Sequence, residues 1–442
     1  MSYPEAARPG GVAGVLSPIT SVREGEAGRA LLLTLNFFLL FTAYYMIKPV
    51  REGLILSLGS GAEIKSYAGG IQAIAFMVLV PAYSSLASRF SGRGILICIY
   101  LFLAANLLAF TALGHAGFPF LGIAFFLWVG MFNLLIVSQT WSLCSDIYTP
   151  RQGKRLFPLI AFGTASGSVF GSLVLTSTVR DKGLFWPMTV AAVLLIICSV
   201  IVRVATPNNS PAARCLPRTE GSPWKRLSGG FGLIFSNRYL TLVALFVLLA
   251  NFVNTNSEYM LGKLVVEHAR EQIASGIASG TSLQVLISTF YSRFYFWISI
   301  VQLLVQFFVV SRIVHHFGIK AALLVLPMLA LFSYSLILFL PLLPLIRLVK
   351  IAENSTNYSL NNTAREILFL PVARQEKYEA KFAVDTCFWR CGDALSMLAV
   401  LIMAGALGLG VAAFAGLNAV LVILWIIVVK HISARRRELL NK

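Results

Sequence analysis

Long apolar stretches alternate with short polar connections along most of the chain. A helix needs about 20 mainly apolar residues to cross the hydrocarbon core of a bilayer. Stretches of this kind cover residues 29–57, 66–87, 95–113, 118–142, 156–178, 185–204, 240–264, 285–310, 318–340, 342–368, 383–408 and 411–432. The pattern therefore predicts an all-α membrane protein with twelve transmembrane helices.

The spans fall into two groups of six, separated by a segment rich in Pro, Gly and Ser. This segment reads as a cytoplasmic linker that ends in a short interfacial helix around Phe231. The predicted organisation is a cytoplasmic N-terminal tail (1–28), a six-helix bundle (29–204), the linker (205–239), a second six-helix bundle (240–432) and a basic cytoplasmic tail (433–442).

Composition supports a membrane protein and explains the charge. The chain is 57% hydrophobic, only 12% charged, and carries a net charge of +18, with a mean hydropathy of +0.79. Basic residues gather in alternate connections, which predicts a multi-pass protein of the bacterial inner membrane with both termini cytoplasmic. Because orientation in the bilayer explains the charge, we expect no nucleic-acid partner. The polar first 28 residues predict no removable signal peptide.

The tenth span carries an unusual row of polar side chains. Arg347, Asn354 and Asn361 recur every seven residues, and Lys350 and Asn357 lie between them at helical spacing. Residues three or four apart share one face of a helix. The spacing predicts a polar stripe that lines water.

Several other spans hold charges that a bilayer interior tolerates poorly. A charge at the centre of a span costs about 2.5–3.5 kcal/mol, and it persists mainly beside a cavity or a partner. Such polar residues are Tyr44, Lys48, Arg51 and Glu52 in the first span; Asn251, Asn254 and Glu258 in the seventh; Arg293 and Tyr295 in the eighth; Glu353 in the tenth; and Asp385, Arg390 and Asp393 in the eleventh. Their mixed signs predict a shared cavity for an anion.

Structural interpretations of these residues stay open. Lys48, Arg51 and Glu52 also fit the outer end of the first span, with their side chains reaching the headgroups. Glu353, Asp385 and Arg390 equally fit ion pairs between helices. In the fifth span, Gly163, Gly167 and Gly171 recur every fourth residue, which predicts close helix packing.

No chemistry typical of an enzyme stands out. The sequence has no phosphate-binding loop of the Gly-x-x-x-x-Gly-Lys-Ser/Thr type and no catalytic or metal-binding spacing, and its six cysteines form no paired pattern. We expect no enzyme activity and no cofactor. The two groups of spans and the missing ATPase motif favour a secondary transporter. We expect it to be a monomer whose partners are the lipid bilayer and a small anionic substrate.

Two loops resemble a conserved loop of the major facilitator superfamily. "SSLASRFSGR" (84–93) and "SRIVHHFGIK" (311–320) lie at matching places in the two halves. Both resemble the Gly-x-Leu-Ala-Asp-Arg-x-Gly-Arg-Arg loop of that superfamily, with the acid replaced. The resemblance implies two pseudo-symmetric six-helix bundles, the major facilitator fold, with the substrate between them at midplane.

Further stretches resemble the ATP:ADP antiporter family of plastids and intracellular bacteria, a divergent branch of that superfamily. They are "IKPVREGLILS" with "GSGAEIKSY", "GKRLFPLIAFG" (153–163), "NFVNTNSEYMLGKL" (251–264) and "NYSLNNTAREILFLPV" (357–372). The resemblance places Arg51 at the substrate-binding lysine of the family, Glu52 at its aspartate and Glu258 at a functional glutamate.

The chain also departs from this family. Asn357 stands where the family has a lysine, Asn361 and Asn362 replace an Asp-Pro pair, and Val129 lies near the position of a glutamate. The resemblance therefore carries the fold further than the substrate. Lys350, two turns earlier on the same stripe, is a candidate for the missing charge.

The leading hypothesis is a transporter that exchanges a nucleotide or related phosphorylated anion by alternating access. Phosphate binding is expected from Lys48, Arg51, Arg293 and Lys350, and contacts to base or sugar from Tyr44, Tyr295 and Asn357. Further substrate contacts are expected from Asn254, Arg347 and Asn361. Glu52 and Glu258 should pair with the cations of the empty site, and Asp385, Arg390 and Asp393 are the candidates for coupling or gating. One alternative is a proton-coupled transporter of a siderophore, peptide-like compound or drug. Another is a membrane sensor without transport.

Overall fold

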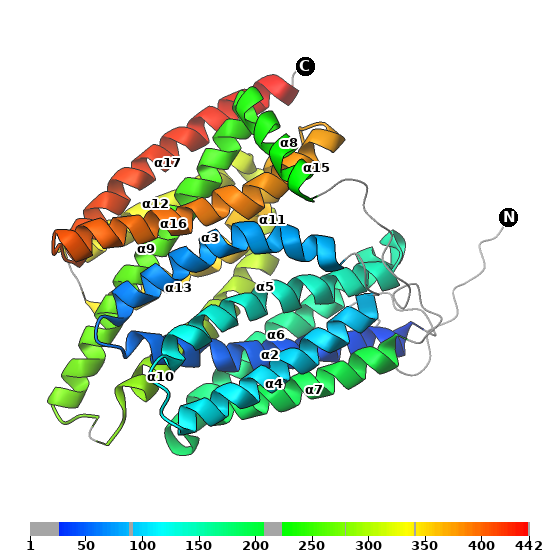
Figure 1. Ribbon diagram of the computed structural model, residues 1–442. Helices are drawn as coiled ribbons and strands as arrows, with labels where there is room; N and C mark the ends of the chain where they lie inside the picture. Colours follow the sequence, from blue (N-terminus) through cyan, green and yellow to red (C-terminus); the bar gives the residue numbers. More distant parts are fainter. Residues whose placement is uncertain (1–25, 88–91, 207–222, 279, 340–341, 441–442) are drawn as a thin grey trace. The chain divides into compact units, whose positions relative to one another are not determined.

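The computed structural model describes residues 26–87, 92–206, 223–278, 280–339 and 342–440 (Figure 1). These residues are helical almost throughout, and they contain no strand. Residues 1–25 of the predicted N-terminal tail and residues 207–222 of the predicted linker lie outside them. The helices of the first half are α2 (Ala27–Leu56), α3 (Gly61–Ala87), α4 (Gly92–His115), α5 (Leu121–Ile147), α6 (Pro150–Lys182) and α7 (Trp186–Ala205).

The second half begins with α8 (Pro223–Ser236), a helix at the place predicted around Phe231. The later α-helices are α9 (Arg238–Ala274), α10 (Leu283–Leu304), α11 (Val310–His316), α12 (Gly318–Phe339), α13 (Leu343–Thr356), α14 (Asn362–Leu368), α15 (Arg374–Ala383), α16 (Trp389–Val400) and α17 (Val411–Leu440). Short π-helical segments interrupt them at η2 (Val305–Val309), η3 (Asn357–Asn361), η4 (Val384–Phe388) and η5 (Leu401–Ala406).

Among the described residues, 11 helices are long and apolar enough to cross a membrane. The remaining predicted span, 342–368, is formed by α13, η3 and α14 in succession, and its polar stripe makes it less apolar than the others. The twelve-helix fold predicted from the sequence fits this arrangement. The last helix continues through the predicted basic tail as far as Leu440.

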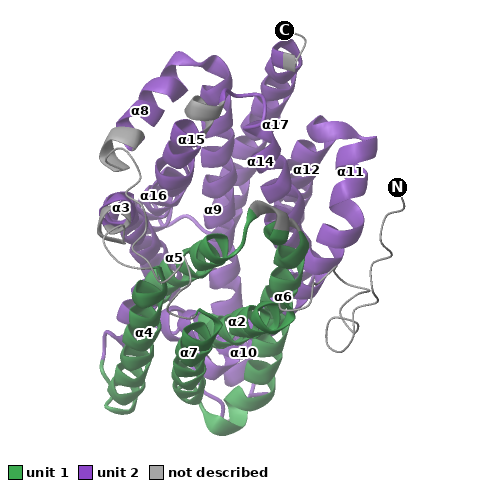
Figure 2. Ribbon diagram, turned by 90° about the vertical axis from the view of Figure 1, so that its right-hand side faces the viewer, with its two compact units in different colours: residues 1–48, 87–118, 129–218 green, residues 49–86, 119–128, 219–442 purple. Residues whose placement is uncertain are grey.

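The chain forms two compact units, which we describe separately (Figure 2). Unit 1 comprises residues 1–48, 87–118 and 129–218, and unit 2 comprises 49–86, 119–128 and 219–442. The border crosses α2 between Lys48 and Pro49. Unit 2 thus combines segments of the first six-helix half with the whole second half. The division into bundles at 29–204 and 240–432 stays a prediction.

Glycines let α6 approach α2 closely in unit 1. A Cβ atom at Gly163 would lie 2.5 Å from the carbonyl oxygen of Thr34, and one at Gly167 would overlap the carbonyl oxygen of Phe38. The Oγ1 of Thr42 donates a hydrogen bond to the Gly167 carbonyl (3.3 Å). Close packing at small residues is how helices associate in membranes, and the packing predicted for this stripe is confirmed.

Buried amides tie α9, α16 and α17 together in unit 2. Asn256 donates from Nδ2 to the Oδ1 of Asn418 (3.0 Å), and Ser396 donates from Oγ to the Oδ1 of Asn256 (2.7 Å). Asn418 in turn donates to the Val253 carbonyl (3.2 Å). These three side chains are fully buried. Because a buried polar group costs free energy without a partner, this network fixes the register of the three helices.

The glycine contact predicts the effect of one added methyl group. Gly167→Ala forces α6 away from the Phe38 carbonyl and should lower the free energy of unfolding by about 1–3 kcal/mol, typical of overpacking. Thermal unfolding of the purified protein in detergent measures this. Gly69→Ala is the matched control, since a Cβ there meets nothing within 4 Å. Equal midpoints for the two variants would contradict the packing account.

Candidate functional site

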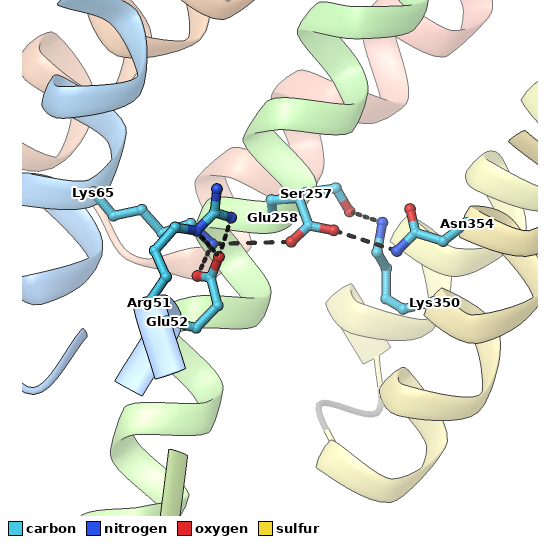
Figure 3. Close-up of polar contacts among 7 residues, drawn as sticks. All are labelled: Arg51, Glu52, Lys65, Ser257, Glu258, Lys350 and Asn354. Carbon is cyan, nitrogen blue, oxygen red and sulfur yellow. Dashed lines mark hydrogen bonds and ion pairs between the residues drawn. The ribbon is translucent and has the colours of Figure 1, made fainter. Parts of the chain in front are cut away.

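Glu52 is the buried acid at the centre of a charged cluster in unit 2. Its side chain is fully buried, and it accepts a hydrogen bond from the Nε of Arg51 (3.1 Å). The Nζ of Lys65, on α3, lies 2.7 Å from the other carboxylate oxygen. Two cations therefore share one carboxylate (Figure 3). An ionised carboxylate is retained in a protein interior only with such partners.

A glycine explains how Glu52 becomes buried. The next residue, Gly53, faces α10 so closely that a Cβ would overlap the Oγ of Ser288. The backbones of α2 and α10 therefore approach each other without an intervening side chain. This approach excludes water from the carboxylate beside it.

Lys65 also reaches a second acid, on α9. Its Nζ lies 4.0 Å from the Oε2 of Glu258 and 5.5 Å from the centre of the Tyr291 ring. Glu258 accepts a hydrogen bond from the Nδ2 of Asn354 on α13 (3.3 Å). The Lys65 ammonium is thus placed between two carboxylates from α2 and α9, and the second carboxylate connects to α13.

A neighbouring ion pair is completely enclosed. Lys350 is 1% exposed; its Nζ donates to the Oγ of Ser257 (2.7 Å) and lies 3.0 Å from the Oε1 of Glu353. The sequence prediction that this stripe lines water is wrong for Lys350 and Asn354, which are buried. The reason is that α9 supplies protein partners for both, Ser257 for one and Glu258 for the other. Phosphate binding by Lys350 stays a prediction.

The charges of the whole cluster balance. Its cations are Arg51, Lys65 and Lys350, and its acids are Glu52, Glu258 and Glu353. A low-dielectric interior disfavours net charge. A bound anion must therefore replace one of these acids as the partner of a cation.

Tyr44 and Lys48 belong to unit 1 and form their own group. The Nζ of Lys48 lies 5.8 Å from the centre of the Tyr44 ring and 5.3 Å from that of Tyr45. Tyr44 stacks on Phe132 with ring centres 5.8 Å apart. The ammonium is thus held over aromatic rings, which attract cations through their negative faces.

Arg293 on α10 and Arg347 on α13, two predicted basic site residues, do not contact Glu52. Arg293 is exposed alongside Trp297, whereas Tyr295 is buried next to Tyr291, with ring centres 5.9 Å apart. Positions 293 and 295 are two residues apart and so point to nearly opposite sides of a helix. Arg347 lies over the Phe290 ring (5.6 Å). The structure does not bring Arg293 or Arg347 to Glu52.

Three predicted asparagines lie further along unit 2. Asn361 donates from Nδ2 to the Oδ1 of Asn357 (3.0 Å). Asn357 and Asn254 line a small void of about 10 Å³ together with Glu353 and Trp425. Asn254 and Asn357 therefore neighbour Glu353 of the enclosed ion pair, and Asn361 is joined to Asn357.

The two predicted acids of the eleventh span, Asp393 and Asp385, lie in different surroundings. Asp393 accepts hydrogen bonds from the Nδ2 of Asn251 (2.8 Å) and the Oγ1 of Thr255 (2.7 Å), and its second oxygen lies 3.6 Å from Arg390. These contacts join α16 to α9. Asp385 lies apart from this group, near the charges of Arg365, Glu366 and Lys381.

Sequence reasoning missed Lys65 because the second span was predicted to begin at residue 66. In the structure α3 begins at Gly61, so Lys65 lies one turn inside the helix. The sequence nevertheless contained one indication that Glu52 and Lys65 could pair. Residues 52 and 65 are equally far from the turn at Leu58 and Gly59, and such positions pair between antiparallel helices.

The described residues contain no group of three His, Cys, Asp or Glu side chains that could hold a metal ion. The chemistry of this cluster is therefore that of ammonium, guanidinium and carboxylate groups.

Two family models match parts of the chain. The model of the Major Facilitator Superfamily matches residues 33–364, more than half of the chain. A second model, described as TLC ATP/ADP transporter, matches residues 345–435.

Individual proteins are similar over different lengths. ADP,ATP carrier protein 1 of Chlamydia muridarum is 21% identical over 457 residues, covering 86% of this chain and 83% of the carrier. For the carrier of the same name from Chlamydia pneumoniae, the match is 26% identical over 144 residues and spans 27% of this chain and only 28% of the carrier.

A solved structure supports the fold. The crystal structure of the nucleoside transporter NupG has a TM-score of 0.64 at 14% identity and covers 90% of this chain and 98% of that chain. At this identity the likeness concerns the fold alone. From its helices and the matched superfamily model, the chain belongs to the Major Facilitator Superfamily, and its C-terminal part is similar to TLC ATP/ADP transporters.

Proposed function

We propose that this membrane transporter exchanges a nucleotide, or a related phosphorylated anion, by alternating access. The observation that carries the proposal is the position of the Lys65 ammonium, 2.7 Å from Glu52 and 4.0 Å from Glu258. A phosphate group that enters this cluster can take the place of one of these acids. Relatives named ADP,ATP carriers support phosphate as the anion.

Exposure distinguishes the two acids. The side chain of Glu52 is fully buried, whereas Glu258 keeps 23% of its surface exposed, and Arg51 and Lys65 keep 15% and 12%. An anion therefore reaches the cations from the side of Glu258. In this proposal the buried carboxylate of Glu52 positions Arg51 and Lys65, and phosphate oxygens displace Glu258 from Lys65.

The two cations suit a phosphate. A guanidinium offers parallel hydrogen bonds to two oxygens, and an ammonium is a compact charge with three donors. A phosphate bound by Arg51 and Lys65 would also neutralise the charge that Glu258 leaves behind. Tyr295, which belongs to the same unit, stays a candidate for a contact to the base, and its aromatic ring suits stacking.

Exchange follows from the charge balance of the empty cluster. Separating α3 from α9 without substrate parts Lys65 from Glu258 and leaves charges without partners in a poorly solvated site, which is costly. A bound phosphate supplies a new partner and removes this cost. Because only the loaded protein then changes conformation readily, transport in one direction requires substrate for the return.

The exchange mechanism predicts dependence on internal substrate. Vesicles of the purified protein loaded with unlabelled ADP should take up labelled ATP at least tenfold faster than empty vesicles, because the empty carrier returns slowly. Filtration of the vesicles at short times measures both rates. Equal rates would contradict exchange.

The same vesicles separate this proposal from proton coupling. Asp393, bonded to the neutral side chains of Asn251 and Thr255, is the acid of the eleventh span best placed to carry a proton. Uptake into empty vesicles driven by a pH gradient alone would favour a proton-coupled transporter of another solute. We expect the gradient to leave exchange unchanged.

The ion pair between Lys65 and Glu258, which we call the lock, is proposed to hold the empty carrier in one conformation. Breaking it should allow uptake without internal substrate. Glu258→Gln removes the acid that holds the empty carrier, so uptake into empty vesicles should rise and the ratio of loaded to empty uptake should fall severalfold. Glu366→Gln is the matched control, because Glu366 pairs with Lys381 away from this cluster. The lock hypothesis fails if Glu258→Gln keeps the wild-type ratio while it still transports.

A further inference from the structure

A positively charged cavity lies near the end of α17, away from the cluster around Lys65. It has a volume of about 400 Å³ and lies between the start of α12 and the last turns of α17, two neighbouring helices of unit 2 (Figure 1). Its basic lining residues are Lys320, Arg436 and Arg437. We call it the C-terminal basic pocket. It shares no residue with the cluster around Lys65.

No carboxylate lines this pocket within the part of the chain that the structure describes. The nearest acid along α17, Glu438, is taken by Arg435, with a separation of 2.5 Å between Nη1 and Oε2. Arg437 donates from Nε to the Ser433 carbonyl of its own helix (3.5 Å). The three positive charges of the pocket therefore lack an acidic counterpart from the lining.

One donor in the pocket is buried and unused. The Nε of Arg436 is shielded from solvent and has no hydrogen-bond partner among the described residues. Leaving a buried N–H without an acceptor is unfavourable. A guanidinium satisfies this need best with oxygens of a phosphate or carboxylate, through charge-assisted hydrogen bonds. The pocket is thus built to receive an anionic oxygen.

Apart from Gly318 and Ser433, the rest of the lining is apolar. It consists of Phe317, which is 74% exposed, and of Ile319, Leu323 and Ile432. Both α12 and α17 are long and apolar enough to cross a membrane, and the pocket lies at the end of each. Phosphate headgroups occupy this depth of a bilayer, with acyl chains beside them.

From these observations we propose that the C-terminal basic pocket binds the phosphate of an anionic phospholipid. Lys320, Arg436 and Arg437 would bind the phosphate oxygens. The apolar residues of the lining would contact the glycerol and the upper acyl chain. A free phosphate ion offers the same oxygens but no apolar part. The combination of unpaired basic groups with an exposed phenylalanine therefore favours the lipid.

Lipid titration tests the proposal on the full chain in detergent. Phosphatidylglycerol should raise the midpoint of thermal unfolding and appear as a bound adduct by native mass spectrometry, whereas phosphatidylcholine should do neither. Lys320→Gln and Arg436→Gln should each weaken phosphatidylglycerol binding about fivefold, since one basic residue contributes about 1 kcal/mol near an anionic lipid. Arg435→Gln is the control of equal charge change and should bind like wild type.

Equal binding of phosphatidylcholine would overturn the proposal, and so would unchanged lipid affinity in both pocket variants or equal weakening by Arg435→Gln. Sodium phosphate is titrated in parallel as the free anion. If it raises the midpoint of thermal unfolding as much as the lipid does, the site binds a free anion and the lipid assignment is wrong. Lys320 is exposed, so its variant should fold even if Arg436→Gln does not.

Discussion

The buried carboxylate of Glu52 is the constraint on which the charged centre of this protein depends. It cannot stay ionised inside an apolar helix bundle without cations, and it therefore fixes Arg51 on its own helix and Lys65 on α3. Lys65, once fixed, lies within reach of Glu258. A single buried charge thus organises α2, α3 and α9, and the glycine beside it lets α10 close over the group.

This arrangement connects the fold to transport. Membership of the Major Facilitator Superfamily gives twelve helices and a transport role, but it does not specify the solute. In the proposed function, two partly exposed cations above a buried acid bind the solute. Asn357 departs from the lysine expected in ATP:ADP antiporters, while Lys65 supplies a positive charge at a different helix. We therefore propose that the chain binds phosphate through its own set of residues.

The sequence predicted helix positions well, because a membrane span must be apolar over about 20 residues and this signal is local. The glycine stripe around Gly167 was predictable for the same reason. Partners between helices were less accessible. Arg293 was grouped with Tyr295 by proximity in the sequence, yet the two point to different sides of α10. Lys350 was expected to face water, but Ser257 and Glu353 enclose it, which only the packing of α9 and α13 reveals.

Equilibrium binding of labelled ADP to the purified protein tests the central claim most directly. We predict that wild-type protein binds ADP, and that Lys65→Gln loses at least about tenfold in affinity, a charge-assisted contact being worth about 1.5–3 kcal/mol. The variant should keep a monodisperse elution profile, and Lys381→Gln, which removes a paired lysine elsewhere, should bind like wild type. Unchanged ADP affinity in a folded Lys65→Gln protein would contradict the account.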